Sequence, residues 1–208
     1  MGTRRDEEQL TMNTRGICDT IRVSALLMLI VPAWAGAQDM LKMCVDCHGE
    51  DGLGTGSDMP IIAGEAPAIQ EDAIFAYADG GRQCVSTPMM CKIASRLTEE
   101  QIIEYAAHFA ALPYKAACEE FDAALAGAGK KIHASSCAKC HGADDPSEAD
   151  DSIGASKLHG QRKDYLRYAL QRYAAGERNQ LPAMEKVTVP LSADDIEALV
   201  HYYASYRD

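Results

Sequence analysis

The chain has 208 residues, of which 31 are acidic and 20 are basic, and its formal net charge is −11. Apolar residues make up 47% of the sequence and charged residues 25%, which is typical of a globular protein and not of a disordered one. The acidic balance argues against nucleic acid and anionic membrane surfaces as partners, because both would repel the chain. Eight cysteines are many for a cytosolic enzyme, so their spacing is informative.

The N-terminal segment has the layout of a secretory signal peptide. A mainly apolar run of nine residues, 23–31, follows basic residues and precedes small residues around Ala35 and Ala37. Nine residues are too few to span a bilayer, which requires about 20. We therefore expect residues 1–37 to be removed on export, with Met12 as an alternative start, and the mature protein to lie in the periplasm without a membrane span. An uncleaved anchor or a buried helix is the alternative.

The rest of the chain contains one unit twice. The motif Cys-x-x-Cys-His occurs at 44–48 and again at 137–141, an offset of 93 residues. A second motif begins at Thr98 and recurs at Ser192, an offset of 94. Nearly equal offsets indicate a duplicated domain. We expect four segments: a signal peptide over 1–37, a first domain over 38–112, a linker over 113–122 and a second domain over 123–208.

Each copy is predicted to be helical, and neither contains a convincing strand, so the expected fold class is all-α. Thr98 and Ser192 are suitable N-caps, and Gly80 and Gly176 are suitable where a helix ends in left-handed backbone. The predicted helices, in chain order, are 39–44, 72–78 and one beginning at Thr98, then 124–137, 164–175 and one beginning at Ser192.

Each copy is too small, and too rich in polar loops, to bury much of its own surface, so we expect a large flat group to fill it. Cys-x-x-Cys-His is the attachment site of a c-type haem, in which the thiols bond the vinyl groups and the histidine binds the iron. A structural zinc is the main alternative, but no cysteine follows Cys140 to complete that site. The residues expected to hold two covalent haems c are Cys44, Cys47, Cys137 and Cys140, with His48 and His141 as axial ligands.

The second axial ligand follows from the available methionines. Met184 is the one methionine of the second copy and lies eight residues before Ser192. Met90 lies eight residues before Thr98 in the first copy. Because both copies place a thioether at the same point, we expect Met90 and Met184 to be the distal ligands, with Met89 as the alternative to Met90.

Four further histidines have no counterpart in the other copy, and we expect each to be an exposed or hydrogen-bonded surface residue: His108, His133, His159 and His201. Iron with histidine and methionine ligands is coordinatively saturated and has a raised reduction potential. The expected function is therefore one-electron transfer and not catalysis. A dihaem peroxidase is the enzymatic alternative.

With these residues in place, the chain resembles a tandem class I cytochrome c. Residues 60–64 (Pro-Ile-Ile-Ala-Gly) and 158–161 (Leu-His-Gly-Gln) are similar to the P-x-L-A-G-Q segment of the dihaem cytochrome c4 family. The resemblance implies that a backbone carbonyl of this segment orients the proximal histidine. Lys157 is expected where the second copy would have the proline, so the second copy departs from the family pattern there.

A closer resemblance is to the dihaem cytochrome subunit of flavocytochrome c sulfide dehydrogenase. Residues 84–94 are similar to its S-T-x-M-x-x-I-A ligand loop, with one extra residue, and residues 121–141 are similar to its link and second haem motif. The resemblance implies an FAD-containing sulfide dehydrogenase flavoprotein subunit as electron donor, and a small soluble cytochrome or an oxidase as acceptor. The flavin must lie on another chain, because this one lacks a dinucleotide fingerprint. A free cytochrome c4-type carrier to a terminal oxidase is the alternative.

Three cysteines of the expected mature chain lie outside the haem motifs. Cys84 and Cys91 lie on either side of Met89 and Met90, and in an oxidising compartment we expect them to form a disulfide that stiffens the ligand loop. Two separate thiols in the haem wall are the alternative. Cys118 has no partner in this scheme.

Overall fold

The structure, a computed structural model, describes residues 34–84 and 88–208. Nearly all of the predicted signal peptide lies outside these residues. The described residues belong to one compact unit that begins at Ala33. They form helices and no strand, apart from one isolated backbone bridge, so the all-α fold class is confirmed. Among them, no helix has both the length and the apolar character that a membrane crossing requires.

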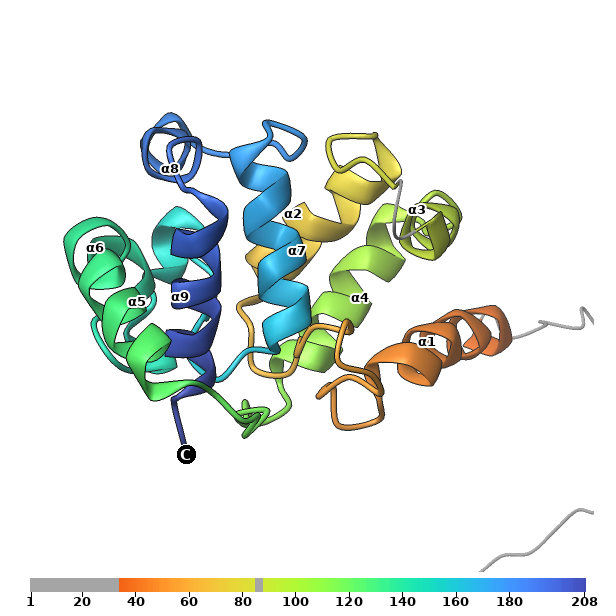
Figure 1. The fold of residues 1–208 in the computed structure, drawn as a ribbon. Coiled ribbons are helices and arrows are strands. Elements are labelled where there is room, and N and C mark those ends of the chain that lie inside the picture. The colour runs from red at the N-terminus through yellow and green to blue at the C-terminus, as the bar shows by residue number, and fades with distance from the viewer. Residues whose placement is uncertain (1–33, 85–87) are drawn as a thin grey trace, which may run out of the picture. The chain divides into compact units, whose positions relative to one another are not determined.

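The helices fall into two series along the chain (Figure 1). The first half contains α1 (Trp34–His48), α2 (Pro67–Ala78), α3 (Pro88–Ala94) and α4 (Glu99–Ala110). The second half contains α5 (Ala123–Ser136), α6 (Ala138–His141), α7 (Lys163–Ala174), α8 (Pro182–Thr188) and α9 (Ala193–Ala204), with 3₁₀ turns at Pro146–Glu148 and Asp151–Ile153. The last three helices of each half match in length, with 12, 7 and 12 residues.

Local chemistry sets the ends of the longer helices as predicted. Thr98 is the N-cap of α4 and Ser192 that of α9, and each closes a capping box with the residue three positions on. Gly80 and Gly176 follow α2 and α7 with φ angles of 86° and 70°. This left-handed backbone suits glycine, which has no Cβ to clash.

Three features of the helices differ from the prediction. α1 begins before Asp39 and continues past Cys44 to His48. α2 begins at Pro67, five residues before the predicted start. The helix predicted over 124–137 is confirmed as α5, and the short helix α6 follows it after Cys137. The seven-residue helices α3 and α8 were not predicted, although each begins with a proline, which suits the first helical position because its φ is fixed and it needs no N–H partner.

The core of the second half is built on α9, which lies between α5 and α7 (Figure 1). Gly129 brings α5 close to α9, since a Cβ added there would lie 2.5 Å from the carbonyl carbon of Ala198. Any larger residue would therefore push the two helices apart. The buried apolar cluster consists of Leu166, Leu170, Ile196, Leu199, Val200, Tyr202 and Tyr203.

The segment predicted as a linker, 113–122, contains no helix and is bonded to the second half. The Tyr114 hydroxyl donates to the carbonyl of His159 at 2.7 Å. The Ala117 N–H donates to the carbonyl of Gly160 at 2.8 Å. These bonds fix the path of the chain between α4 and α5.

Candidate haem-binding sites

The two Cys-x-x-Cys-His motifs lie where helices end. Cys44, Cys47 and His48 occupy the last turns of α1. In the second half the motif begins at the break between α5 and α6, and His141 is the last residue of α6. Residues three apart on a helix lie on one face, so each pair of cysteines is presented on the same side. All four thiols are free and partly buried.

A backbone carbonyl holds each of the two histidine rings. Nδ1 of His48 lies 3.4 Å from the carbonyl oxygen of Pro60, and Nδ1 of His141 lies 2.8 Å from that of Ser156. A carbonyl only accepts, so Nδ1 carries the proton and Nε2 keeps its lone pair. Burial lowers the pKa of both rings, which keeps them neutral. Each Nε2 is therefore suited to bind a metal ion.

In the second half the carbonyl belongs to Ser156 and not to Lys157. Gly64 and Gly160 are equivalent, because the N–H of each donates to a carbonyl near the end of the last helix of its own half, at 3.0 and 2.8 Å. Counting back four residues from each glycine places Ser156 opposite Pro60. The prediction that Lys157 replaces the proline was therefore wrong by one residue. The loop after the histidine is three residues longer in the second half, which obscured the alignment.

The predicted distal ligands occupy the same position in two equivalent helices. Met90 is the third residue of α3, and Met184 is the third residue of α8. Both side chains are partly buried. Met89 is 54% exposed, and the equivalent residue in α8 is Ala183, which has no ligating atom. The helix register thus favours Met90 over Met89.

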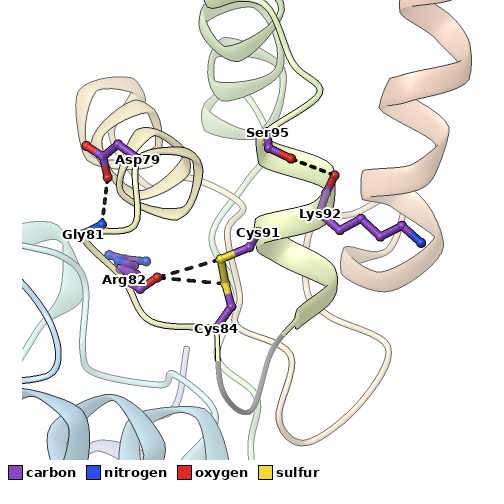
Figure 2. The surroundings of a disulfide bond; sticks show 7 residues. All are labelled: Asp79, Gly81, Arg82, Cys84, Cys91, Lys92 and Ser95. Carbon is purple, nitrogen blue, oxygen red and sulfur yellow. Dashed lines mark hydrogen bonds between the residues drawn. A yellow bond between two sulfur atoms is a disulfide. The ribbon is translucent and has the colours of Figure 1, made fainter.

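A disulfide joins Cys84 and Cys91, whose Cα atoms are 6.1 Å apart, and this is the pairing expected from the sequence. Figure 2 shows that the bridge ties α3 to the turn after α2, with both sulfur atoms 3.8–4.0 Å from the carbonyl oxygen of Arg82. Cys118 is free and exposed.

The second half fixes the corresponding turn with hydrogen bonds. Gln180 occupies the position of Cys84, counted from the glycine that ends the middle helix. Its Oε1 accepts from the Thr188 hydroxyl in α8 at 2.7 Å, and its Nε2 donates to the carbonyl of Tyr173 in α7 at 3.0 Å. In both halves, therefore, the turn is tied to the helix that carries the methionine.

Two histidines expected at the surface are buried: His133 is 0% and His159 is 1% exposed. Nε2 of His133 donates to the carbonyl of Gly142 at 2.6 Å, so its Nδ1 accepts from the Tyr203 hydroxyl at 3.0 Å. Nε2 of His159 lies 3.2 Å from the hydroxyl of Tyr202. Both are hydrogen-bonded, but the prediction that they lie at the surface was wrong, because the hydroxyls that cover them come from α9, 70 residues along the chain from His133 and 43 from His159.

The other two histidines fit the expectation. His108 is exposed on α4. Nδ1 of His201, on α9, accepts a hydrogen bond from the N–H of Asp122 at 2.8 Å.

A polar side chain at the same position of each half bonds to the backbone of the other half. Gln161 accepts from the Ile61 N–H at 2.8 Å and donates to the Ile61 carbonyl at 2.9 Å. Glu65 accepts from the Lys157 N–H at 3.0 Å. Glu65 and Gln161 each follow the glycine of the repeated segment, and Ile61 and Lys157 each lie three residues before it. These bonds are therefore related by an approximate twofold symmetry.

A second pair of equivalent residues meets between the halves. Arg82 and Arg178 form an antiparallel backbone bridge. The guanidinium of Arg178 lies 5.9 Å and 5.0 Å from the ring centres of Tyr165 and Tyr173. Its Nη2 is buried and has no hydrogen-bond partner among the described residues. No carboxylate in those residues pairs with either arginine, so the site suits an anionic group from outside the chain, such as a haem carboxylate.

Comparison with known proteins agrees with this geometry. Residues 124–202 match the family model described as cytochrome c oxidase, cbb3-type, subunit III. Cytochrome c-554(548) of Halomonas halodenitrificans is 35% identical over 75 residues, 36% of this chain and 90% of that protein. The thiosulfate dehydrogenase electron acceptor of Thiomonas intermedia is 26% identical over 194 residues, 88% of this chain and 86% of that protein. Cytochrome c4 of Stutzerimonas stutzeri is 27% identical over 206 residues, which is 88% of this chain and 96% of that protein.

Solved structures extend the likeness to both halves. Reduced cytochrome c4 from Pseudomonas stutzeri superposes with a TM-score of 0.70 at 24% identity, over 82% of this chain and 96% of that one, and this match shows the fold. Thiosulfate dehydrogenase TsdBA from Marichromatium purpuratum superposes with a TM-score of 0.61 at 29% identity. That match spans 78% of this chain and 36% of the other.

The fold and the paired sites define a c-type cytochrome, and the chain belongs to the cytochrome c family. Its two motifs and its likeness to cytochrome c4 make it a cytochrome c4-like dihaem electron carrier with two covalent haems c. The relatives support the cytochrome c4 alternative at least as directly as the sulfide dehydrogenase subunit.

Proposed function

We propose that this cytochrome is an exported carrier that accepts electrons one at a time from an enzyme oxidising a reduced sulfur compound and passes them to a small soluble cytochrome or an oxidase. The observation that supports a carrier most strongly is the duplicated site, in which each half offers a neutral histidine and a methionine at matching positions. Iron bound on both faces exchanges electrons and has no open position for a substrate.

The roles of the residues follow from this proposal. Each bound haem supplies one-electron chemistry, and the chain supplies the ligands, the buried surroundings and the contact surface. The buried Nη2 of Arg178 would bind a haem carboxylate. Cys44, Cys47, Cys137 and Cys140 would hold the two rings, and His48, Met90, His141 and Met184 would bind the two irons.

Replacing single methionines tests the ligands. We expect Met90→Ala and Met184→Ala each to abolish sulfur coordination at one haem, measured by the sulfur-to-iron absorption band of the oxidised protein. Met89→Ala is the matched control and should keep the band of both haems. Loss of the band in Met89→Ala with its retention in Met90→Ala would reverse the assignment. Retention of both bands in all three variants would refute methionine ligation.

The sulfur-oxidising donor is supported by two different likenesses. The link around 121–141 resembles that of the sulfide dehydrogenase cytochrome and favours its FAD-containing flavoprotein subunit. The thiosulfate dehydrogenase electron acceptor is similar over 88% of the chain and favours thiosulfate dehydrogenase. Stopped-flow mixing of the oxidised cytochrome with each enzyme and its substrate distinguishes the two, since the true donor should reduce both haems rapidly. Reduction by neither, together with rapid oxidation by a terminal oxidase, would support the free cytochrome c4-type carrier.

Export is the remaining part of the proposal. It is supported by the apolar run at 23–31, the small residues after it and the disulfide, which persists in an oxidising compartment. N-terminal sequencing of the protein recovered from the periplasm should begin near Gly36 or Gln38. Recovery of the full-length chain in the cytoplasm would contradict export.

A further inference from the structure

The carbonyl that holds each proximal histidine belongs to a peptide group that also bonds to the other half. The Pro60 carbonyl and the Ile61 N–H are the two ends of one peptide group, and the latter donates to Gln161. In the second half, the Ser156 carbonyl and the following N–H form the equivalent peptide group, and that N–H donates to Glu65. Each histidine is thus one peptide group away from a side chain of the opposite half.

The two side chains differ in charge. Gln161 is a neutral amide and both accepts from and donates to the facing backbone. Glu65 can offer a carboxylate, and its side chain is only 12% exposed. Burial raises its pKa, while the N–H and the ammonium group of Lys157, 4.0 Å away, act in the opposite direction. The other titratable groups that face Glu65 are Asp151, Tyr114 and Tyr165.

We propose that Glu65 is a positioning residue that lowers the reduction potential of the haem held by His141 in the other half. The inference rests on the proposed function, because it requires His141 to be an iron ligand. Glu65 acts through the peptide group between Ser156 and Lys157, and Gln161 exerts the weaker, neutral effect on the haem held by His48.

The direction follows from hydrogen-bond polarisation. A carboxylate that accepts from the Lys157 N–H draws that proton toward itself and increases the negative charge on the Ser156 carbonyl oxygen. The stronger acceptor pulls the Nδ1 proton of His141, so the imidazole becomes a better donor to the metal. A better donor stabilises oxidised iron more than reduced iron, which lowers the potential.

The test is Glu65→Gln, a substitution that the fold already accommodates at the equivalent position. We expect the potential of the second-half haem to rise, increasing its ratio of reduced to oxidised form about threefold at fixed ambient potential, or ~28 mV for one electron. The first-half haem should move less, although Glu65 lies in its own half. In the reduced, ¹⁵N-histidine-labelled protein, the His141 Nδ1 proton resonance should move upfield as its hydrogen bond weakens.

Asp151→Asn is the matched control. It removes a carboxylate 3.7 Å from the Lys157 ammonium group but leaves the peptide group untouched, so it should move the His141 resonance little. Gln161→Glu is the mirror variant and should lower the potential of the haem held by His48. The potential of the second-half haem should depend on pH in the native protein and less so in Glu65→Gln.

Equal shifts of both haems in Glu65→Gln, or an unmoved His141 resonance, would overturn the inference. So would an Asp151→Asn variant that reproduces the effect, because a general change in charge would then explain it. Either result leaves two haems with histidine and methionine ligands, so the proposed function would stand. Absence of haem, or ligation by other residues, would instead refute the proposed function itself.

Discussion

The two halves fix the same turn by different means. In the first half the turn before the ligand helix is closed by the bridge between Cys84 and Cys91. In the second half Gln180 takes that place and reaches Thr188 and the end of α7 through hydrogen bonds. The fold thus needs this turn to be tied down but does not prescribe the chemistry. A covalent tie limits the unfolded chain, whereas hydrogen bonds act only in the folded state.

The halves also differ beside the haem motifs. The second half buries His133 and His159 against the hydroxyls of two α9 tyrosines. The position equivalent to His159 in the first half is occupied by Ala63. The position equivalent to Tyr203 is occupied by Phe109, which has no hydroxyl. We therefore expect the second half to be sensitive to acid and the first half to be sensitive to reductant.

The largest effect is expected at the contact of α5 with α9. Gly129→Ala places a Cβ against the backbone of Ala198, which cannot yield without moving a helix, and should lower the free energy of unfolding by ~3 kcal/mol or more. Gly127→Ala, in the same helix but with open space around it, should instead raise it by about 1 kcal/mol. Chemical denaturation of both variants measures the difference. If both variants changed the free energy of unfolding equally, the close packing of α5 against α9 would not depend on a glycine at position 129.

Acid should weaken the second half next. Burial lowers the pKa of His159 to about 4, so between its ordinary pKa and that value the unfolded chain binds a proton that the folded chain does not. The free energy of unfolding is therefore at its full value above about pH 6.5. It falls by up to ~3 kcal/mol as the pH drops toward the pKa of His159 in the folded protein. Denaturation as a function of pH, for the native protein and His159→Gln, should show a shallower slope in the variant. An unchanged slope would show that His159 does not cause the loss of stability in acid.

Removing the disulfide should affect the first half. The double variant Cys84→Ser/Cys91→Ser releases a loop with a sequence separation of seven, worth ~2.5 kcal/mol on the chain-entropy model. Hydrogen exchange should quicken in α3 while α8 stays protected. Reduction of the native protein with a dithiol serves as a second route to the same state. Equal loss of protection in α8 would contradict a local role for the bridge.

The smallest effect is expected for the hydrogen-bonded counterpart. Gln180→Ala removes two hydrogen bonds at the turn before α8 and should cost about 1–2 kcal/mol, because each such bond contributes roughly 1 kcal/mol net. Exchange in α8 should quicken and that in α3 should not. A larger loss of stability than in the disulfide variant would show that the hydrogen bonds of Gln180 stabilise their turn more than the disulfide stabilises its own.

The parts of the structure that depend on local chemistry could be predicted from the sequence. Thr98 and Ser192 identify helix starts because a hydroxyl at the N-cap bonds to the next turn. The haem motifs and the repeated methionines could be recognised in the sequence because their spacing is fixed within each copy. The bonds between Ile61 and Gln161, 100 residues apart, and the burial of His133 depend on which distant segments meet, and no local pattern reveals that.

The most direct test of the central claim is the mass of the protein isolated from the periplasm, denatured and washed in acid so that only covalently held groups remain. Two bound haems predict a mass that exceeds that of the mature polypeptide by two haem groups, with one lost when Cys137 and Cys140 are both replaced by alanine. A mass equal to that of the polypeptide alone would contradict the account.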